Sequence, residues 1–132
     1  MNRIETQKQW LAEDTAYWLA ARKHKNYDAK NHNIRCLMTL CGPKKPIITE
    51  RTLRALERWH KNHGYRITFM PGLDDFRGMT PLGFMALRGV GMRCLIFFGA
   101  LMQLEGYWKE YDLASLHYQV NNGLRSRSGW VA

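Results

Sequence analysis

Apolar residues near the start of the chain recur at a spacing that is typical of a helix. Ile4, Leu11 and Trp18 are seven residues apart, and this repeat keeps side chains on one face of an α-helix. The apolar residues expected beside them are Ala12, Ala16 and Leu19. The pattern predicts an amphipathic helix from about Glu5 to Tyr27.

The middle of the chain predicts a strand, a helix and a second strand. Ile34 to Leu40 alternates weakly between apolar and polar residues and ends at the turn residues Gly42 to Pro46. Thr49 is a suitable N-cap for a helix that continues to about Asn62, and Tyr65 to Met70 is the second expected strand. These elements predict an α+β fold that is mainly α-helical.

The segment Met92 to Leu104 is apolar on nearly every side. We expect a buried helix at the centre of the molecule, with a homodimer seam as the alternative. At 132 residues the chain is long enough for one compact domain with a real core, residues 1–132. Its expected parts are an amphipathic helix over 1–30, the strand-helix-strand unit over 33–70, two joined helices over 80–105, and a helix with a basic tail over 111–132.

A short connection joins the capped segment Thr80 to Leu87 to the apolar segment Met92 to Leu104. It consists of Leu87-Arg88-Gly89-Val90-Gly91-Met92-Arg93. So short a turn between helices needs backbone angles open to glycine, and Gly89 and Gly91 would supply them on either side of a buried Val90. The amides at the start of the second helix would then face outward and carry partial positive charge.

This connection resembles the helix-hairpin-helix family of nucleic-acid-binding motifs, over Thr80 to Leu104. The matching residues are Leu87, Gly89, Val90 and Gly91, with Arg93 where a lysine is common. Arg88 replaces the usual proline, and Leu95 replaces the usual alanine. The resemblance implies that backbone amides and cations hold a phosphate oxygen, and the alternative is an ordinary turn. The expected phosphate-binding residues are Arg88, Gly89, Gly91 and Arg93.

A second resemblance is to winged helix-turn-helix repressors of the LexA type. Ile48 to Arg51 and Asn62 to Tyr65 are similar to the two ends of their opening helix. The segments Asp112 to Val120 and Leu124 to Trp130 are a second candidate for such a helix-turn-helix. The resemblance implies a regulator that reads DNA sequence.

The charge of the chain favours a polyanionic partner. There are 20 Lys and Arg residues against 11 Asp and Glu, so the formal net charge is +9, and the isoelectric point is about 9.8. Nucleic acid is the expected partner for such a protein. A membrane surface is the alternative partner, because basic segments with tryptophan also bind anionic lipid. We nevertheless predict no membrane partner.

The central helix is expected to have a cationic face. Glu50 with Arg54, and Glu57 with Lys61, could instead form ordinary i,i+4 pairs on a solvated surface. The helix nevertheless has four cations on this face and only these two anions. The residues at three- and four-residue steps on the cationic face are Arg51, Arg54, Arg58 and Lys61.

Two other basic segments are candidates for phosphate contacts. The far end of the first expected helix becomes basic, with Arg22, Lys23, Lys25 and Lys30 opposed only by Asp28. They either complement the carboxyl end of that helix or contact phosphate. The basic tail near the end of the chain contains Arg125 and Arg127, and such tails either lie along a phosphate backbone or fray.

Metal and catalytic sites are weakly supported. Cys36, Cys41, His60 and His63 are the right residue types for zinc, but their spacing misses that of zinc fingers. Asp74 and Asp75 are adjacent carboxylates with no third acid nearby, so turn residues are expected there. We therefore predict no enzyme activity, no metal and no cofactor. The aromatic residues that could stack on bases or fill the core are Trp59, Tyr65, Trp108 and Tyr118.

The expected location is the cytoplasm. The longest strictly apolar run, Cys94 to Met102, is too short to span a bilayer, and the amino terminus lacks the apolar stretch of a signal peptide. The odd number of cysteines, 3, favours free thiols in a reducing compartment.

The sequence thus predicts a protein that binds the phosphates of nucleic acid with low sequence specificity. DNA is the first expected ligand and RNA the second. One alternative is a small basic inhibitor that acts on an acidic protein surface, of the kind made by viruses and mobile elements. The other is a winged-helix transcriptional regulator.

Overall fold

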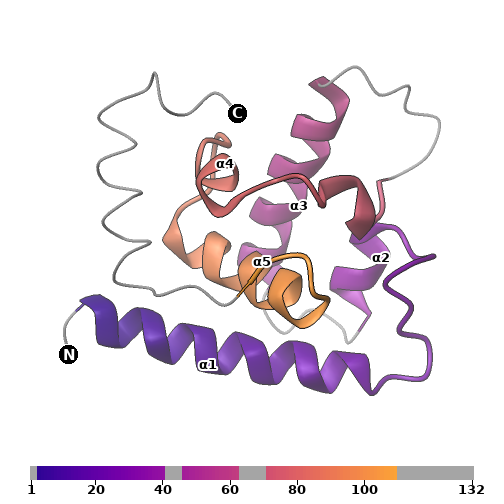
Figure 1. The fold of residues 1–132 in the computed structure, drawn as a ribbon, viewed down its shortest axis with the longest axis horizontal. Coiled ribbons are helices and arrows are strands. Elements are labelled where there is room, and N and C mark those ends of the chain that lie inside the picture. Colours follow the sequence, from indigo (N-terminus) through magenta and orange to yellow (C-terminus); the bar gives the residue numbers. More distant parts are fainter. Residues whose placement is uncertain (1–2, 41–45, 63–70, 110–132) are drawn as a thin grey trace.

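The computed structural model describes residues 3–40, 46–62 and 71–109, and these residues are mostly helical (Figure 1). No strand occurs in these ranges. Asn33 and Gly72 form an isolated antiparallel β-bridge. The expected α+β fold is therefore wrong for the part of the chain that is described. The elements are α1 (Arg3–Arg22), α2 (Ile34–Thr39), α3 (Pro46–Asn62), the 3-10 helix η1 (Leu73–Phe76), α4 (Pro81–Met85) and α5 (Met92–Leu104).

The segment that we expected as the first strand is helix α2. The side chain of Asn33 caps it by accepting a hydrogen bond of 2.8 Å from the backbone N–H of Cys36. Ile34, Leu37 and Met38 then lie one helical turn apart and are all buried. Six residues are too few to show a helical period in the sequence. Packing against the core therefore favours the helix here. The second expected strand, residues 65–70, lies outside the described residues.

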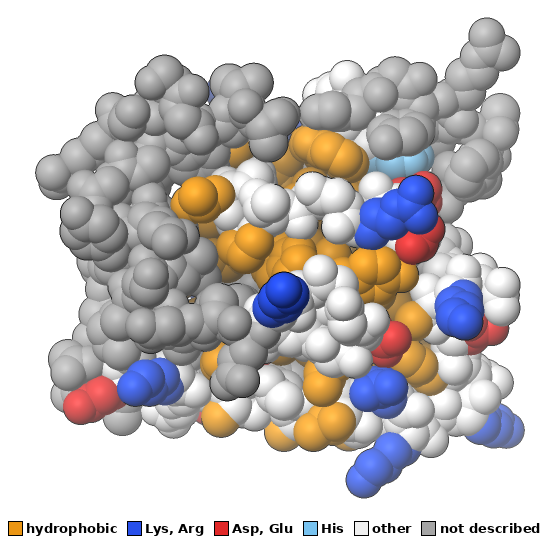
Figure 2. Space-filling model, in the orientation of Figure 1, with side chains coloured by type: hydrophobic (Ala, Val, Ile, Leu, Met, Phe, Trp, Pro, Cys, Tyr) orange, Lys and Arg blue, Asp and Glu red, His pale blue; other side chains and the backbone are white. Residues whose placement is uncertain are grey.

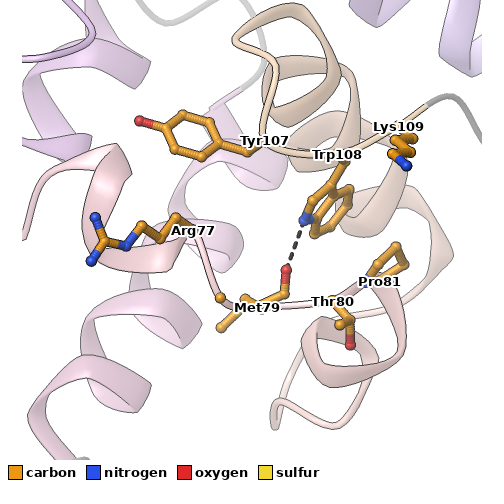
Figure 3. A pocket seen from close by; sticks show the side chains of 8 residues that line it. Arg77, Met79, Thr80, Pro81, Tyr107, Trp108 and Lys109 are labelled. Carbon is orange, nitrogen blue, oxygen red and sulfur yellow. Dashed lines mark hydrogen bonds between the residues drawn. The ribbon is translucent and has the colours of Figure 1, made fainter.

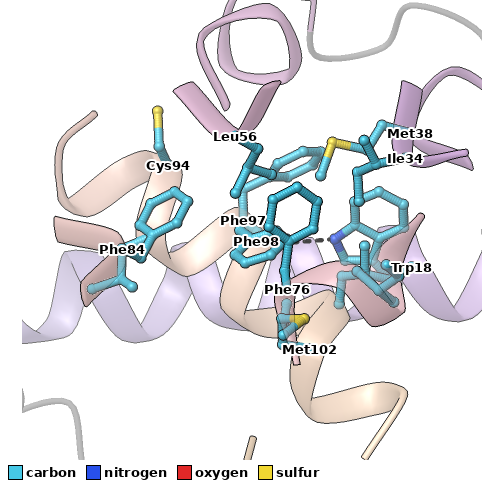
Figure 4. Packing of buried hydrophobic residues seen from close by; sticks show 14 of the residues in the cluster. Trp18, Ile34, Met38, Leu56, Phe76, Phe84, Cys94, Phe97, Phe98 and Met102 are labelled. Carbon is cyan, nitrogen blue, oxygen red and sulfur yellow. Dashed lines mark hydrogen bonds between the residues drawn. The ribbon is translucent and has the colours of Figure 1, made fainter. Parts of the chain in front are cut away.

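Helix α5 lies at the centre of the fold, as predicted, between α1 on one side and α3 behind (Figure 1). Every residue from Cys94 to Met102 is buried within the single chain. Figure 4 shows the side chains of Phe97 and Phe98 among those of Trp18 and Phe76. The Trp18 indole N–H donates a hydrogen bond of 2.9 Å to the backbone oxygen of Phe97, so its polar atom is satisfied inside the core.

Helix α1 forms as predicted but ends at Arg22, and its buried face is rotated from the expected one. Ala12 and Ala16 are exposed, and the exposed fraction of Leu19 is 44%. The buried stripe instead includes two polar residues, Gln7 and Asp14, together with Trp18. Apolar spacing alone could not identify this face because two of its positions are polar.

The carboxyl ends of α1 and α5 are joined by a polar cluster around Glu105. The Tyr27 hydroxyl donates a hydrogen bond of 2.7 Å to Oε1 of Glu105, and the Nε of Arg22 lies 3.4 Å from the same oxygen. Burial, followed by the neighbouring carboxylate, raises the pKa of Tyr27 well above its usual range. This cluster fixes the turn after α1 against the end of α5.

Among the described residues, none of the helices combines the length and the apolar character needed to cross a lipid bilayer.

Candidate nucleic-acid interface

The cationic face predicted for the central helix is present on α3. Its opposite side packs into the core through Leu53 and Leu56, which are both fully buried. His60 is also buried, with its ring 6.2 Å from that of Phe76, which agrees with a packing role. The helix begins at Pro46, earlier than the expected cap at Thr49. The four cations of the face are exposed: Arg51, Arg54, Arg58 and Lys61.

The connection between α4 and α5 lies beside this cationic face. The two segments together line one surface hollow of about 420 Å³, which we call the arginine hollow. Sequence reasoning found each segment separately, but the spatial proximity of Arg88 to the α3 arginines was not predictable from their spacing. The lining residues are Arg51, Arg54, Ala55 and Arg58 from α3, and Arg88 and Gly89 from the connection.

The two acids of α3 are directed toward Arg35 of α2. Its guanidinium binds Glu57 at 2.7 Å and Glu50 at 3.2 Å, and this interaction with Arg35 lowers the pKa of Glu50 more than that with Arg54 does. Glu50 also accepts a hydrogen bond of 3.1 Å from Nε of Arg54. One of the two expected i,i+4 pairs therefore forms, while Glu57 serves to hold α2 against α3.

The remaining arginines of the hollow lack a carboxylate partner in the described part of the chain. No acid there forms an ion pair with Arg51, Arg58 or Arg88. Since only Arg54 is partly neutralised, the hollow is cationic. On the face drawn in Figure 2, the described Lys and Arg side chains stand apart from one another or beside acids.

The connection itself uses its two glycines differently. Gly89 has a φ of +86°, in the left-handed region that favours glycine. Gly91 is the N-cap of α5 with a φ of −135°, an extended angle that any residue adopts. Val90 is only half-buried, although it packs against the core. The expected need for glycine thus holds at Gly89 and is wrong at Gly91.

Arg93, an expected phosphate ligand, forms a bidentate pair with Asp14 of α1. Its Nη2 lies 3.1 Å from Oδ1, and its Nη1 contacts Oδ2. Asp14 is fully buried, and the Arg93 side chain is 23% exposed. The guanidinium carbon also lies 5.2 Å from the centre of the Trp10 ring, a cation–π distance. Arg93 therefore joins α1 to α5, through a partner distant in the sequence.

The expected turn role of the adjacent carboxylates agrees with their contacts. Asp75 accepts a hydrogen bond of 2.8 Å from the N–H of Gly72, and Asp74 pairs with Arg77 at 3.3 Å. The Tyr107 hydroxyl also donates to Asp74, at 3.2 Å. These contacts stabilise η1 and its flanking residues.

A second, smaller hollow of about 240 Å³ lies beside these residues, between the segments 77–81 and 107–109 (Figure 3). Trp108 forms part of its wall and is only 8% exposed. Its indole N–H donates a hydrogen bond of 2.7 Å to the backbone oxygen of Met79. The ring is thus a core residue and is not presented for stacking on a base.

The other sequence candidates are separated or lie outside the described residues. Cys36 is exposed while His60 is buried, and Cys41 and His63 fall outside the described ranges. Within those ranges no group of three potential metal ligands occurs. The basic tail with Arg125 and Arg127 also lies outside them, as do Tyr65 and Tyr118.

Comparisons with protein families, with curated proteins and with solved structures found no significant match. The resemblances to helix-hairpin-helix and winged-helix proteins therefore stay predictions.

Proposed function

We propose that this protein binds the phosphates of nucleic acid at the arginine hollow. DNA is the first expected ligand and RNA the second. The observation that carries the proposal is the gathering of Arg51, Arg58 and Arg88 around one hollow without carboxylate partners in the described residues. Guanidinium groups match phosphate oxygens with two parallel hydrogen bonds. Gly89 has no side chain, so it also lets a strand approach the backbone closely.

The lining of the hollow favours backbone contacts over sequence reading. Apart from the four arginines it contains Ala55 and Gly89, and therefore no aromatic ring for base stacking and no side-chain acceptor for base amino groups. Phosphate contacts position a protein on a strand but carry no sequence information. We therefore expect similar affinity for unrelated sequences.

The number of arginines sets the expected salt dependence. If each of the four neutralises one phosphate, log K should fall against log salt with a slope of about −3.6 on duplex DNA and about −2.8 on a single strand. Raising the salt from about 50 to about 200 mM should then weaken duplex binding by about 150-fold.

The test is fluorescence anisotropy of labelled single- and double-stranded DNA of unrelated sequences at these two salt concentrations. The variant Arg51→Gln with Arg58→Gln should reduce the size of the duplex slope by about 2, because two phosphate contacts are lost. The matched control, Lys8→Gln with Lys109→Gln, removes the same charge at two exposed residues outside the hollow. It should leave the slope nearly unchanged.

Two results would contradict the proposal. If both double variants weakened binding equally, net charge rather than the hollow would explain the affinity. If the unmodified protein bound no strand at the lower salt, nucleic acid would be excluded as the direct partner. An acidic protein surface would then be the partner to seek.

A further inference from the structure

We infer that the turn after α1 forms a second phosphate contact, at the opposite end of α5 from the arginine hollow, so that one nucleic-acid molecule touches both. The second surface consists of Lys23, Lys25 and Lys30, which we call the α1-end cluster. All three are exposed. The inference rests on the proposed function and adds a separate site to it.

The α1-end cluster is presented by an ordered turn. The N–H of His24 donates to the backbone oxygen of Ala21 at 3.0 Å, and the N–H of Tyr27 donates to that of His24 at 2.9 Å. The Tyr27 hydroxyl binds Glu105 beyond the end of α5. The lysines therefore project from a segment whose position is fixed relative to α5.

The acid nearest in sequence does not neutralise these lysines, and Glu105 pairs with Arg22. Asp28 is the only Asp or Glu between residues 22 and 33. Its carboxylate accepts hydrogen bonds from the backbone N–H groups of Lys30 and Asn31 and from the Asn31 side chain, at 3.1, 3.1 and 2.7 Å. The Asn31 side chain is the main cause of the lowered pKa of Asp28. Asp28 thus closes the turn, and no ammonium group in the described residues pairs with it.

The carboxyl end of α1 does not account for the whole cluster. Helix α1 ends at Arg22, and the attraction of a helix end for cations falls off within its last turn. Lys23 is close enough to benefit, but Lys25 and Lys30 follow in the turn beyond the helix. Their exposed charges are therefore available to an external anion.

The two cationic surfaces lie at opposite ends of α5. Arg88 and Gly89 of the hollow come just before its first residue, Met92. Glu105, just after its last residue, contacts both Arg22 and Tyr27 beside the α1-end cluster. A helix of 13 residues is about 20 Å long at about 1.5 Å per residue. That length corresponds to about six base pairs of duplex.

DNA length therefore separates the two contacts. A duplex of about 6 base pairs seated in the hollow ends before it reaches the α1-end cluster, whereas one of about 24 base pairs extends past it. We expect the cluster to contribute to the binding of long DNA only.

The experiment measures anisotropy on hairpin duplexes of about 6 and about 24 base pairs at several salt concentrations. The variant Lys25→Gln with Lys30→Gln leaves the helix end intact and removes two of the expected contacts. The slope of log K against log salt should become about 2 smaller on the long duplex and stay nearly constant on the short one. The control variant Lys8→Gln with Lys109→Gln should change neither slope.

The failures of the two proposals are distinguishable. If Lys25→Gln with Lys30→Gln leaves the slope on the long duplex unchanged, while Arg51→Gln with Arg58→Gln lowers it, the second contact is refuted and the hollow stands. An equal loss on both lengths would refute the separation of the two surfaces. Absence of binding by the unmodified protein would refute both.

Discussion

Replacing Arg93 by methionine should test whether this arginine holds the fold together or binds phosphate. The change removes the guanidinium from the fully buried carboxylate of Asp14 and from the Trp10 ring. Methionine keeps an apolar side chain near Trp10 but cannot pair with a charge. We expect a large loss of stability and little specific loss of nucleic-acid binding.

The size of the effect follows from the burial of Asp14. Removing the guanidinium weakens the compensation of a fully buried carboxylate, and breaking such a pair costs about 3 to 5 kcal/mol. The lost cation–π contact adds about 0.5 to 1 kcal/mol. For a chain of 132 residues this corresponds to a fall in Tm of roughly 10 to 20 °C.

The assay is urea unfolding followed by circular dichroism, with a double variant as the internal check. Asp14→Leu combined with Arg93→Met replaces both charges by apolar groups, and such replacements are often close to neutral. The double variant should therefore recover most of the lost free energy of unfolding. If Arg93→Met alone does not fold, recovery in the double variant still tests the argument.

The reasoning would be refuted if Arg93→Met lowered the free energy of unfolding by less than about 1 kcal/mol and reduced the salt slope of DNA binding by about 1. That combination would identify Arg93 as a phosphate ligand. A double variant that is less stable than the single one would also contradict the proposed pairing.

Three further substitutions test a turn glycine and two helix caps. Gly89→Ala should lower the free energy of unfolding by about 1 to 2 kcal/mol because its φ of +86° disfavours a side chain. Gly91→Ser should raise it by about 0.3 kcal/mol by capping α5. Tm measurements that ranked the two variants in the opposite order would contradict this. Asn33→Ala should cost about 1 kcal/mol by removing the cap of α2, and an unchanged urea midpoint would show that the cap contributes nothing.

The sequence by itself determined the elements whose signals are local. Helix α5 spans Met92–Leu104 as expected, because a long apolar run defines a buried helix. The side chain of Thr80 caps α4 at the N–H of Gly83, a contact between near neighbours in the chain. The cationic row of α3 followed from helical period alone.

Helix α2 shows where local signals were insufficient. Six residues, Ile34–Thr39, are compatible with either a strand or a helix by composition. The burial of Ile34, Leu37 and Met38 on one side depends on the core that α5 and α3 create. Only tertiary packing could select the helix.

The tertiary structure also decided which charges remain available to a ligand. The partner of Arg93 is Asp14 on another helix, and the partner of Glu57 is Arg35 rather than a neighbour on α3. These pairs remove Arg93 from the candidate interface and leave the cationic row of α3 exposed beside Arg88. Sequence spacing specifies which residues share one helix face, but charge pairing between helices depends on how those helices pack, and that is determined by the core as a whole.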